Sequence, residues 1–117
     1  SFGHAIESLT NYEVPHGISV SYGMDMANFV SVKMDYLQSK IRQEIRELLE
    51  QIWDGYVISN LSIEKFANAL SKDKKNIGKE LRLILCKGYG KLFKTGIQLD
   101  RQFMGWLEEY FDKELVH

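Results

Sequence analysis

Proline occurs only once in this 117-residue chain, at Pro15, and clusters of turn-forming residues are few. Proline is tolerated in the first turn of a helix and breaks a helix elsewhere. The long proline-free stretches can therefore be helical, and apolar residues recur in them at helical spacing. The pattern predicts a mainly α fold with one small β-hairpin, formed by residues 1–117 as a single domain. This length is sufficient for one modest core.

The expected helices cover residues 1–9, 16–34, 38–54, 62–71 and 100–115, and the hairpin covers 81–95. Ser62 and Asp100 are the expected N-caps of the last two helices. Residues 38–54 show the cleanest periodicity. Their expected apolar face consists of Ile41, Ile45, Leu48, Leu49, Ile52 and Trp53. Their expected solvated face consists of Arg42, Glu44, Arg46, Glu47 and Glu50.

The helix expected over residues 16–34 is apolar on most sides, which is typical of a buried helix. Ser21, Asp25 and Asn28 form one narrow polar stripe along it. We expect this stripe either to face solvent or to line a cleft.

Composition and charge narrow the class of protein. The formal net charge is −1, so no overall field draws the chain to nucleic acid or to a membrane surface, and neither is an expected partner. Cys86 is the single cysteine, which excludes an internal disulfide and fits a reducing, cytoplasmic location. No apolar stretch is long enough to span a bilayer.

Two histidines, each beside a glycine, are the chain's main chemical signal. Residues 3–7 read Gly-His-Ala-Ile-Glu, residues 15–17 read Pro-His-Gly, and Val20, Gly23 and Met24 follow. An imidazole can serve as a metal ligand, a proton carrier or a phosphate partner. A histidine–glycine pair alone is common, and two histidines in a small domain are more often structural or exposed than catalytic.

The full pattern resembles the second half of the signature of the dehydroquinate synthase family, GHxxGHAIE…HGExVxxGMxxA. Residues 72–90 are similar to a second stretch of that family, DKKxxxGxLRxVLLxxIG. The resemblance implies a lyase of the shikimate pathway, which supplies aromatic amino acids. Such an enzyme converts a seven-carbon sugar-acid phosphate into 3-dehydroquinate, eliminates phosphate, and uses NAD and a divalent metal, usually zinc.

The resemblance also implies roles for particular residues. His16 corresponds to a metal ligand, and His4 to a catalytic histidine near the substrate phosphate. A lysine of the 72–75 block would bind the same phosphate, with Lys75 as the first choice, also catalytic, and Lys74 as the second. Glu7 would bond a histidine ring or a helix end in a structural role.

By the same resemblance, the chain begins inside the double GH motif, with the first histidine of that motif one position before Ser1. We therefore expect the C-terminal fragment of a larger enzyme, whose NAD-binding domain lies upstream. Alone it would supply one of three metal ligands, bind neither NAD nor zinc as the family does, and be inactive.

One residue departs from the family pattern, because Ile18 replaces the glutamate of HGE. This departure leaves two alternatives open. One is a divergent sugar-phosphate cyclase that makes an inosose or valiolone-type ring. The other is a helical interaction module without catalytic activity. The oligomeric state is also open, a homodimer included.

Overall fold

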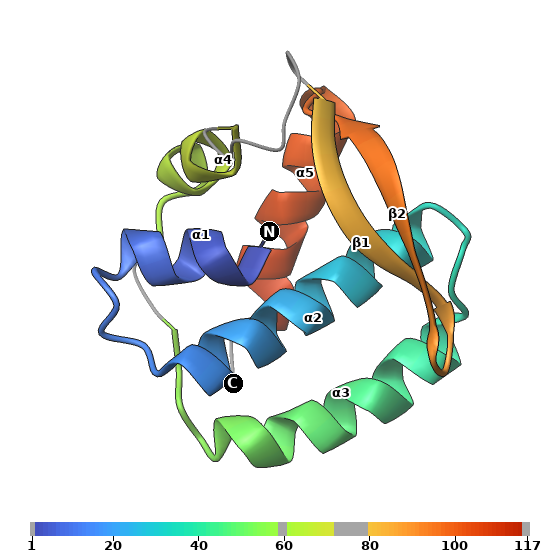
Figure 1. Cartoon of the computed structure of the whole chain (residues 1–117), viewed down its shortest axis with the longest axis horizontal. Helices are drawn as coiled ribbons and strands as arrows, with labels where there is room; N and C mark the ends of the chain where they lie inside the picture. The colour runs from blue at the N-terminus through green and yellow to red at the C-terminus, as the bar shows by residue number, and fades with distance from the viewer. Residues whose placement is uncertain (1, 59–60, 72–79, 116–117) are drawn as a thin grey trace.

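The computed structural model describes residues 2–58, 61–71 and 80–115 (Figure 1). It confirms a mainly helical fold with one antiparallel hairpin. The elements in order are α1 (Phe2–Leu9), α2 (His16–Lys33), α3 (Ser39–Trp53), α4 (Ile63–Ser71), β1 (Glu80–Gly88), β2 (Lys91–Gln98) and α5 (Arg101–Glu109). A π-helical turn, Tyr110–Glu114, continues α5.

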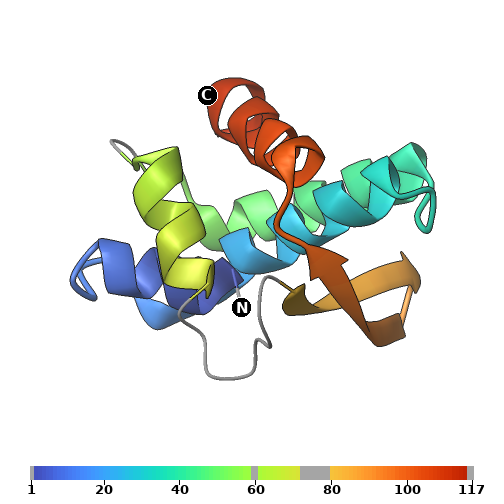
Figure 2. The same ribbon diagram turned by 90° about the horizontal axis from the view of Figure 1, so that it is seen from above.

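Helix α2 passes through the middle of the molecule, and the other elements pack around it (Figure 1). Figure 2 shows α5 on one side of α2 and the hairpin on the other. Tyr22, Met26 and Val30 of α2 are among the most buried side chains. The prediction that this helix is buried is therefore confirmed. None of the described helices is both long enough and apolar enough to cross a membrane.

The helix ends follow the expected local chemistry. Asp100 caps α5, since its Oδ1 accepts a hydrogen bond of 2.9 Å from the backbone N–H of Phe103. The Ser62 hydroxyl accepts from the N–H of Lys65 at 3.3 Å, at the start of α4. Helix α3 ends at Asp54, which is in the left-handed region (φ 47°).

Helices α1 and α2 touch backbone to backbone at two glycines. A Cβ atom on Gly23 would lie 2.6 Å from the backbone nitrogen of Gly3, closer than real Cβ contacts allow. A Cβ on Gly3 would lie 3.1 Å from the carbonyl oxygen of Ser19. Glycine at both positions therefore allows this close pairing, which sets α1 against the first turns of α2.

A buried ionic cluster joins α2, α3 and the C-terminal turn. Asp25 of α2 is fully buried. Its carboxylate accepts bonds from Arg42 Nε (3.0 Å) and Nη2 (2.8 Å), Arg46 Nη1 (2.8 Å) and the hydroxyl of Tyr110 (2.7 Å). Both arginines also bond Glu114. We call these five residues the Asp25 cluster.

Two predictions about which polar residues of α2 and α3 face solvent were wrong. The polar stripe of α2 neither faces solvent nor lines a cleft, because Ser21, Asp25 and Asn28 are all buried. Arg42 and Arg46 are buried too, so they do not belong to a solvated face. The physical reason is that a buried charge is tolerated when an opposite charge and hydrogen bonds meet it.

The apolar face of α3 also differs from the expected one. Leu49 and Trp53 are buried, but Leu48 and Ile52 are 60% and 53% exposed. The buried stripe of α3 is rotated toward its arginines, because these must reach Asp25.

Candidate functional site

His16 is the first residue of α2 and is held by a carboxylate from α1. Its side chain is 77% exposed, whereas that of Glu7 is 15% exposed. The ring Nδ1 of His16 lies 2.8 Å from Oε1 of Glu7. The preceding Pro15 has a φ of −55°, the value that its ring imposes, so the chain enters the helix in a fixed direction.

His4 is exposed on α1, one turn before Glu7. Its neighbour Gly3 contacts α2 at Ser19 and Val20, one turn from His16. The two histidines therefore lie on adjacent helices, and neither is a core histidine. The roles of both histidines stay predictions.

An exposed strip of α2 continues from His16. Gly17, Val20 and Met24 are exposed although α2 is otherwise mostly buried. Val20 and Met24 are 40% and 49% exposed. The family-type residues His16, Gly17 and Met24 are thus on the exposed side of a central helix, whereas Gly23 is buried against α1.

Lys74 and Lys75 fall in residues 72–79, outside the described residues. The preceding helix, α4, packs against α1 through stacked rings of Phe2 and Phe66, whose centroids are 6.1 Å apart. The assignment of a phosphate contact to either lysine stays a prediction.

Among the described residues, no group of three or more His, Cys, Asp or Glu side chains could hold a metal ion. A catalytic zinc site usually has three protein ligands. The described part of the chain can therefore offer His16 as one donor. Its exposure fits a ligand whose companions belong to another part of a protein.

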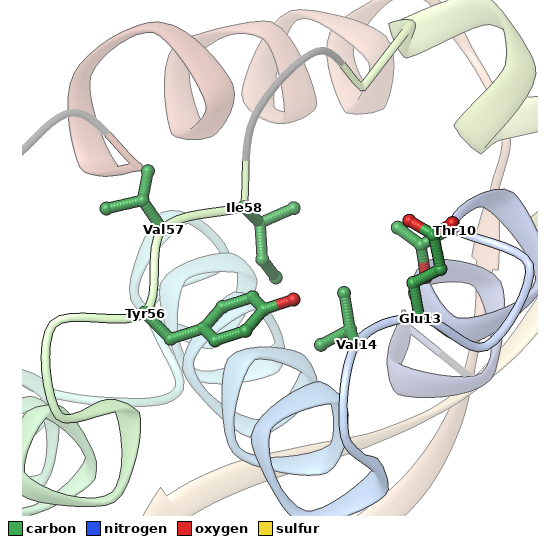
Figure 3. Close-up of a pocket in the computed structure, with 6 residues that line it drawn as sticks. All are labelled: Thr10, Glu13, Val14, Tyr56, Val57 and Ile58. Carbon is green, nitrogen blue, oxygen red and sulfur yellow. The ribbon is translucent and has the colours of Figure 1, made fainter.

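A hollow of about 150 Å³ lies elsewhere, where the α1–α2 connection meets the segment after α3 (Figure 3). Its lining residues are Thr10, Glu13, Val14, Tyr56, Val57 and Ile58. Ligand pockets usually measure about 300–1,000 Å³. This hollow is smaller, and neither histidine lines it, so we do not assign the function to it.

Burial raises the pKa of two tyrosines, Tyr22 of α2 and Tyr110 of the C-terminal turn. Burial raises the pKa of Tyr22 to about 12. Burial, together with the charge and hydrogen bond of Asp25, raises the pKa of Tyr110 well above its usual value. Both phenols are structural, since Tyr22 donates to the carbonyl of Tyr56 at 2.7 Å and Tyr110 donates to Asp25.

Comparison with known proteins agrees with the fold and with the motif. Residues 1–76 match the family model described as 3-dehydroquinate synthase C-terminal. A 3-dehydroquinate synthase of Helicobacter pylori (strain P12) is 38% identical over 91 residues, which cover 77% of this chain and 26% of the relative. That of Syntrophotalea carbinolica is 40% identical over 92 residues, covering 77% and 25%.

Among solved structures, a crystal structure of 2-deoxy-scyllo-inosose synthase complexed with carbaglucose-6-phosphate, NAD+ and Co2+ has a similar fold. The TM-score is 0.77 and the sequence identity 21%, over 95% of this chain and 32% of that one. The chain thus shares the fold of the matching part of that synthase. The chain belongs to the 3-dehydroquinate synthase family. It spans about a quarter of the length of the curated relatives named above.

Proposed function

We propose that this chain is the C-terminal part of a longer 3-dehydroquinate synthase-like enzyme. That enzyme would cyclise a seven-carbon sugar-acid phosphate and eliminate phosphate. The main supporting observation concerns His16, at the HG position of the family. Its imidazole is exposed at the start of the central helix and is hydrogen-bonded to a carboxylate. Because the chain spans about a quarter of its relatives, we place the NAD-binding domain in the remaining part.

The chain's own residues would bind and orient the substrate. His16 would hold the divalent metal, zinc in our proposal, through the ring nitrogen that Glu7 does not contact. His4 would donate a hydrogen bond to the substrate phosphate, and Lys75, or Lys74 in its place, would face the same phosphate as a point charge. When bound, NAD would supply hydride transfer and the metal would polarise substrate oxygens. The single Cys86, buried and without a disulfide partner in the sequence, supports a cytoplasmic enzyme.

A second candidate is a divergent cyclase of the inosose type. Two observations favour it: the fold similarity to 2-deoxy-scyllo-inosose synthase, and Ile18 at the family's glutamate position. Ile18 is partly buried and packs against the core. The residue at this position therefore contributes to packing in this chain, rather than to the exposed surface around His16.

The test is a substrate comparison with the longer protein, supplied with NAD and zinc. We expect phosphate release and a dehydroquinate product from the seven-carbon sugar-acid phosphate. Release from glucose 6-phosphate instead would favour the inosose type. Release from neither would favour the non-catalytic interaction module. Residues 1–117 alone should be inactive, because one metal donor and part of a phosphate site do not form a complete catalytic geometry.

Lys75 and Lys79 offer a matched pair of variants in the same protein. Lys75→Ala should lower kcat/KM by roughly 10- to 150-fold, the effect of losing one charge-assisted contact worth about 1.5–3 kcal/mol. Lys79→Ala should change it little. Equal behaviour of the two variants would remove Lys75 from the phosphate site and leave Lys74 as the candidate.

A further inference from the structure

The metal role proposed for His16 does not by itself explain its hydrogen bond to Glu7 of α1. We propose that Glu7 is a positioning residue. It keeps the proton of the neutral His16 ring on Nδ1 and so presents the Nε2 lone pair on the exposed side. The proposal rests on the proposed metal role of His16 and goes beyond it, because it explains how the ligand atom is selected.

The chemistry of the pair fixes which atom is the donor. An ionised carboxylate only accepts hydrogen bonds, so in the 2.8 Å contact Nδ1 of His16 must donate to Glu7. A neutral imidazole has one N–H group, which leaves Nε2 with a free lone pair. A metal binds such a lone pair, and metal-bound histidines commonly donate the other N–H to a carboxylate.

Glu7 lies on α1, whose two ends are held by hydrogen bonds and by close packing. The end of α1 is closed by Thr10, whose hydroxyl donates to the carbonyl of Ile6 at 2.9 Å, and by a bond of 2.8 Å from the N–H of Tyr12 to the carbonyl of Glu7 itself. At the other end, α1 is set against α2 at Gly3. Ligands supported by fixed secondary structure are held more precisely than ligands on loops.

The same contact gives the Ile18 substitution a structural context. Residues 16 and 18 project from nearly opposite sides of a helix, since each residue turns the helix by about 100°. Ile18 packs toward the core, while the carboxylate that His16 contacts comes from α1. Replacement of the family's glutamate at position 18 therefore leaves His16 with a carboxylate partner.

The competing explanation is that Glu7 and His16 form an ion pair whose only effect is to stabilise the packing of α1 against α2. The two explanations differ in the state of the ring. In an ion pair the ring carries a proton on both nitrogens and has no free lone pair, whereas in the proposed arrangement the neutral ring keeps one proton, on Nδ1. They also differ in whether loss of Glu7 weakens metal binding beyond its effect on folding.

The first measurement is ¹⁵N NMR of the histidine rings at mildly alkaline pH, with the His16 signal identified by its loss in His16→Ala. We expect an Nδ1–H ring in the unmodified protein, and a shift toward Nε2–H in Glu7→Ala but not in Glu13→Ala. Glu13 is a suitable control because it is an exposed carboxylate on the connection between the same two helices. An Nε2–H ring in the unmodified protein would overturn the proposal.

The second measurement is the dissociation constant of Co2+ in the longer protein. Glu7→Ala should weaken binding by roughly 10- to 100-fold, the usual effect of losing such a partner. Glu7→Gln, which still offers an acceptor oxygen, should recover part of this loss, and the cobalt absorption bands should change in Glu7→Ala. If His16→Ala abolishes binding while Glu7→Ala binds normally, Glu7 has no positioning role but the metal assignment stands. If His16→Ala binds cobalt normally, the proposed function itself fails.

Discussion

Replacing Asp25 with alanine should destabilise the protein strongly. The substitution removes an acceptor of four hydrogen bonds and leaves two arginine side chains, 10% and 8% exposed, without their shared carboxylate. Breaking a buried ion pair in this way costs about 3–5 kcal/mol. Small domains have a total unfolding free energy of about 5–15 kcal/mol. The loss is therefore a large part of the total and should lower Tm by on the order of 10–20 °C.

Thermal unfolding followed by circular dichroism measures this loss. Asp112→Ala is the matched control, because Asp112 is an exposed aspartate in the C-terminal turn, and it should change stability by less than about 0.5 kcal/mol. A triple variant, Asp25→Leu with Arg42→Met and Arg46→Met, should regain part of the stability, since no arginine is then buried without Asp25, although Glu114 loses both arginines and the Tyr110 hydroxyl loses its acceptor. A loss below about 1 kcal/mol in Asp25→Ala would refute the view that this cluster joins the helices.

Two further predictions follow from close packing and from buried phenols. Gly23→Ala should cost about 1–3 kcal/mol of unfolding free energy, because its Cβ would lie 2.6 Å from the Gly3 nitrogen, whereas Gly17→Ala, whose Cβ meets nothing within 4 Å, should be neutral or stabilising. Equal unfolding midpoints in urea for the two variants would contradict this. Stability should also fall as pH rises from about 10 toward 12, because an unfolded tyrosine releases its proton near 10 while folded Tyr22 keeps it to about 12. A pKa shift of about two units corresponds to roughly 3 kcal/mol of unfolding free energy. Tyr22→Phe should therefore flatten the dependence of Tm on pH in this range. An unchanged slope would exclude Tyr22 as the source of this dependence.

Local patterns predicted most elements because local physics determines them. Asp100 caps a helix through a bond to Phe103, three residues away, and this signal is visible in the sequence. The hairpin also lies where alternating apolar residues and Gly88 and Gly90 predicted it. Such features need no knowledge of the tertiary arrangement.

The Asp25 cluster could not be predicted in the same way. Its bonds join residues 17 to 85 positions apart, on three different elements. Helical periodicity assigns a charged residue to solvent, so Arg42 and Arg46 were placed on the wrong face. The one available signal was an aspartate within an otherwise apolar helix, because a buried carboxylate requires a cationic partner.

The pairing of Glu7 with His16 depends on how the chain reverses between α1 and α2. Asn11 and Tyr12 both adopt the left-handed conformation, with φ of 52° and 62°. No glycine marks this reversal in the sequence, and tyrosine rarely adopts such a φ. A bond from Glu7 to a histidine ring was one of two expectations from the motif, but its pairing with His16, nine positions away, was visible only in the structure.

The metal content of two single variants of the longer protein tests the central claim most directly. His16→Ala and His4→Ala each remove one exposed histidine, from adjacent helices, but we assign only His16 to the metal. After identical purification and zinc loading, His4→Ala should retain zinc as the unmodified protein does, and His16→Ala should lose most of it. Full zinc content in His16→Ala would contradict the account.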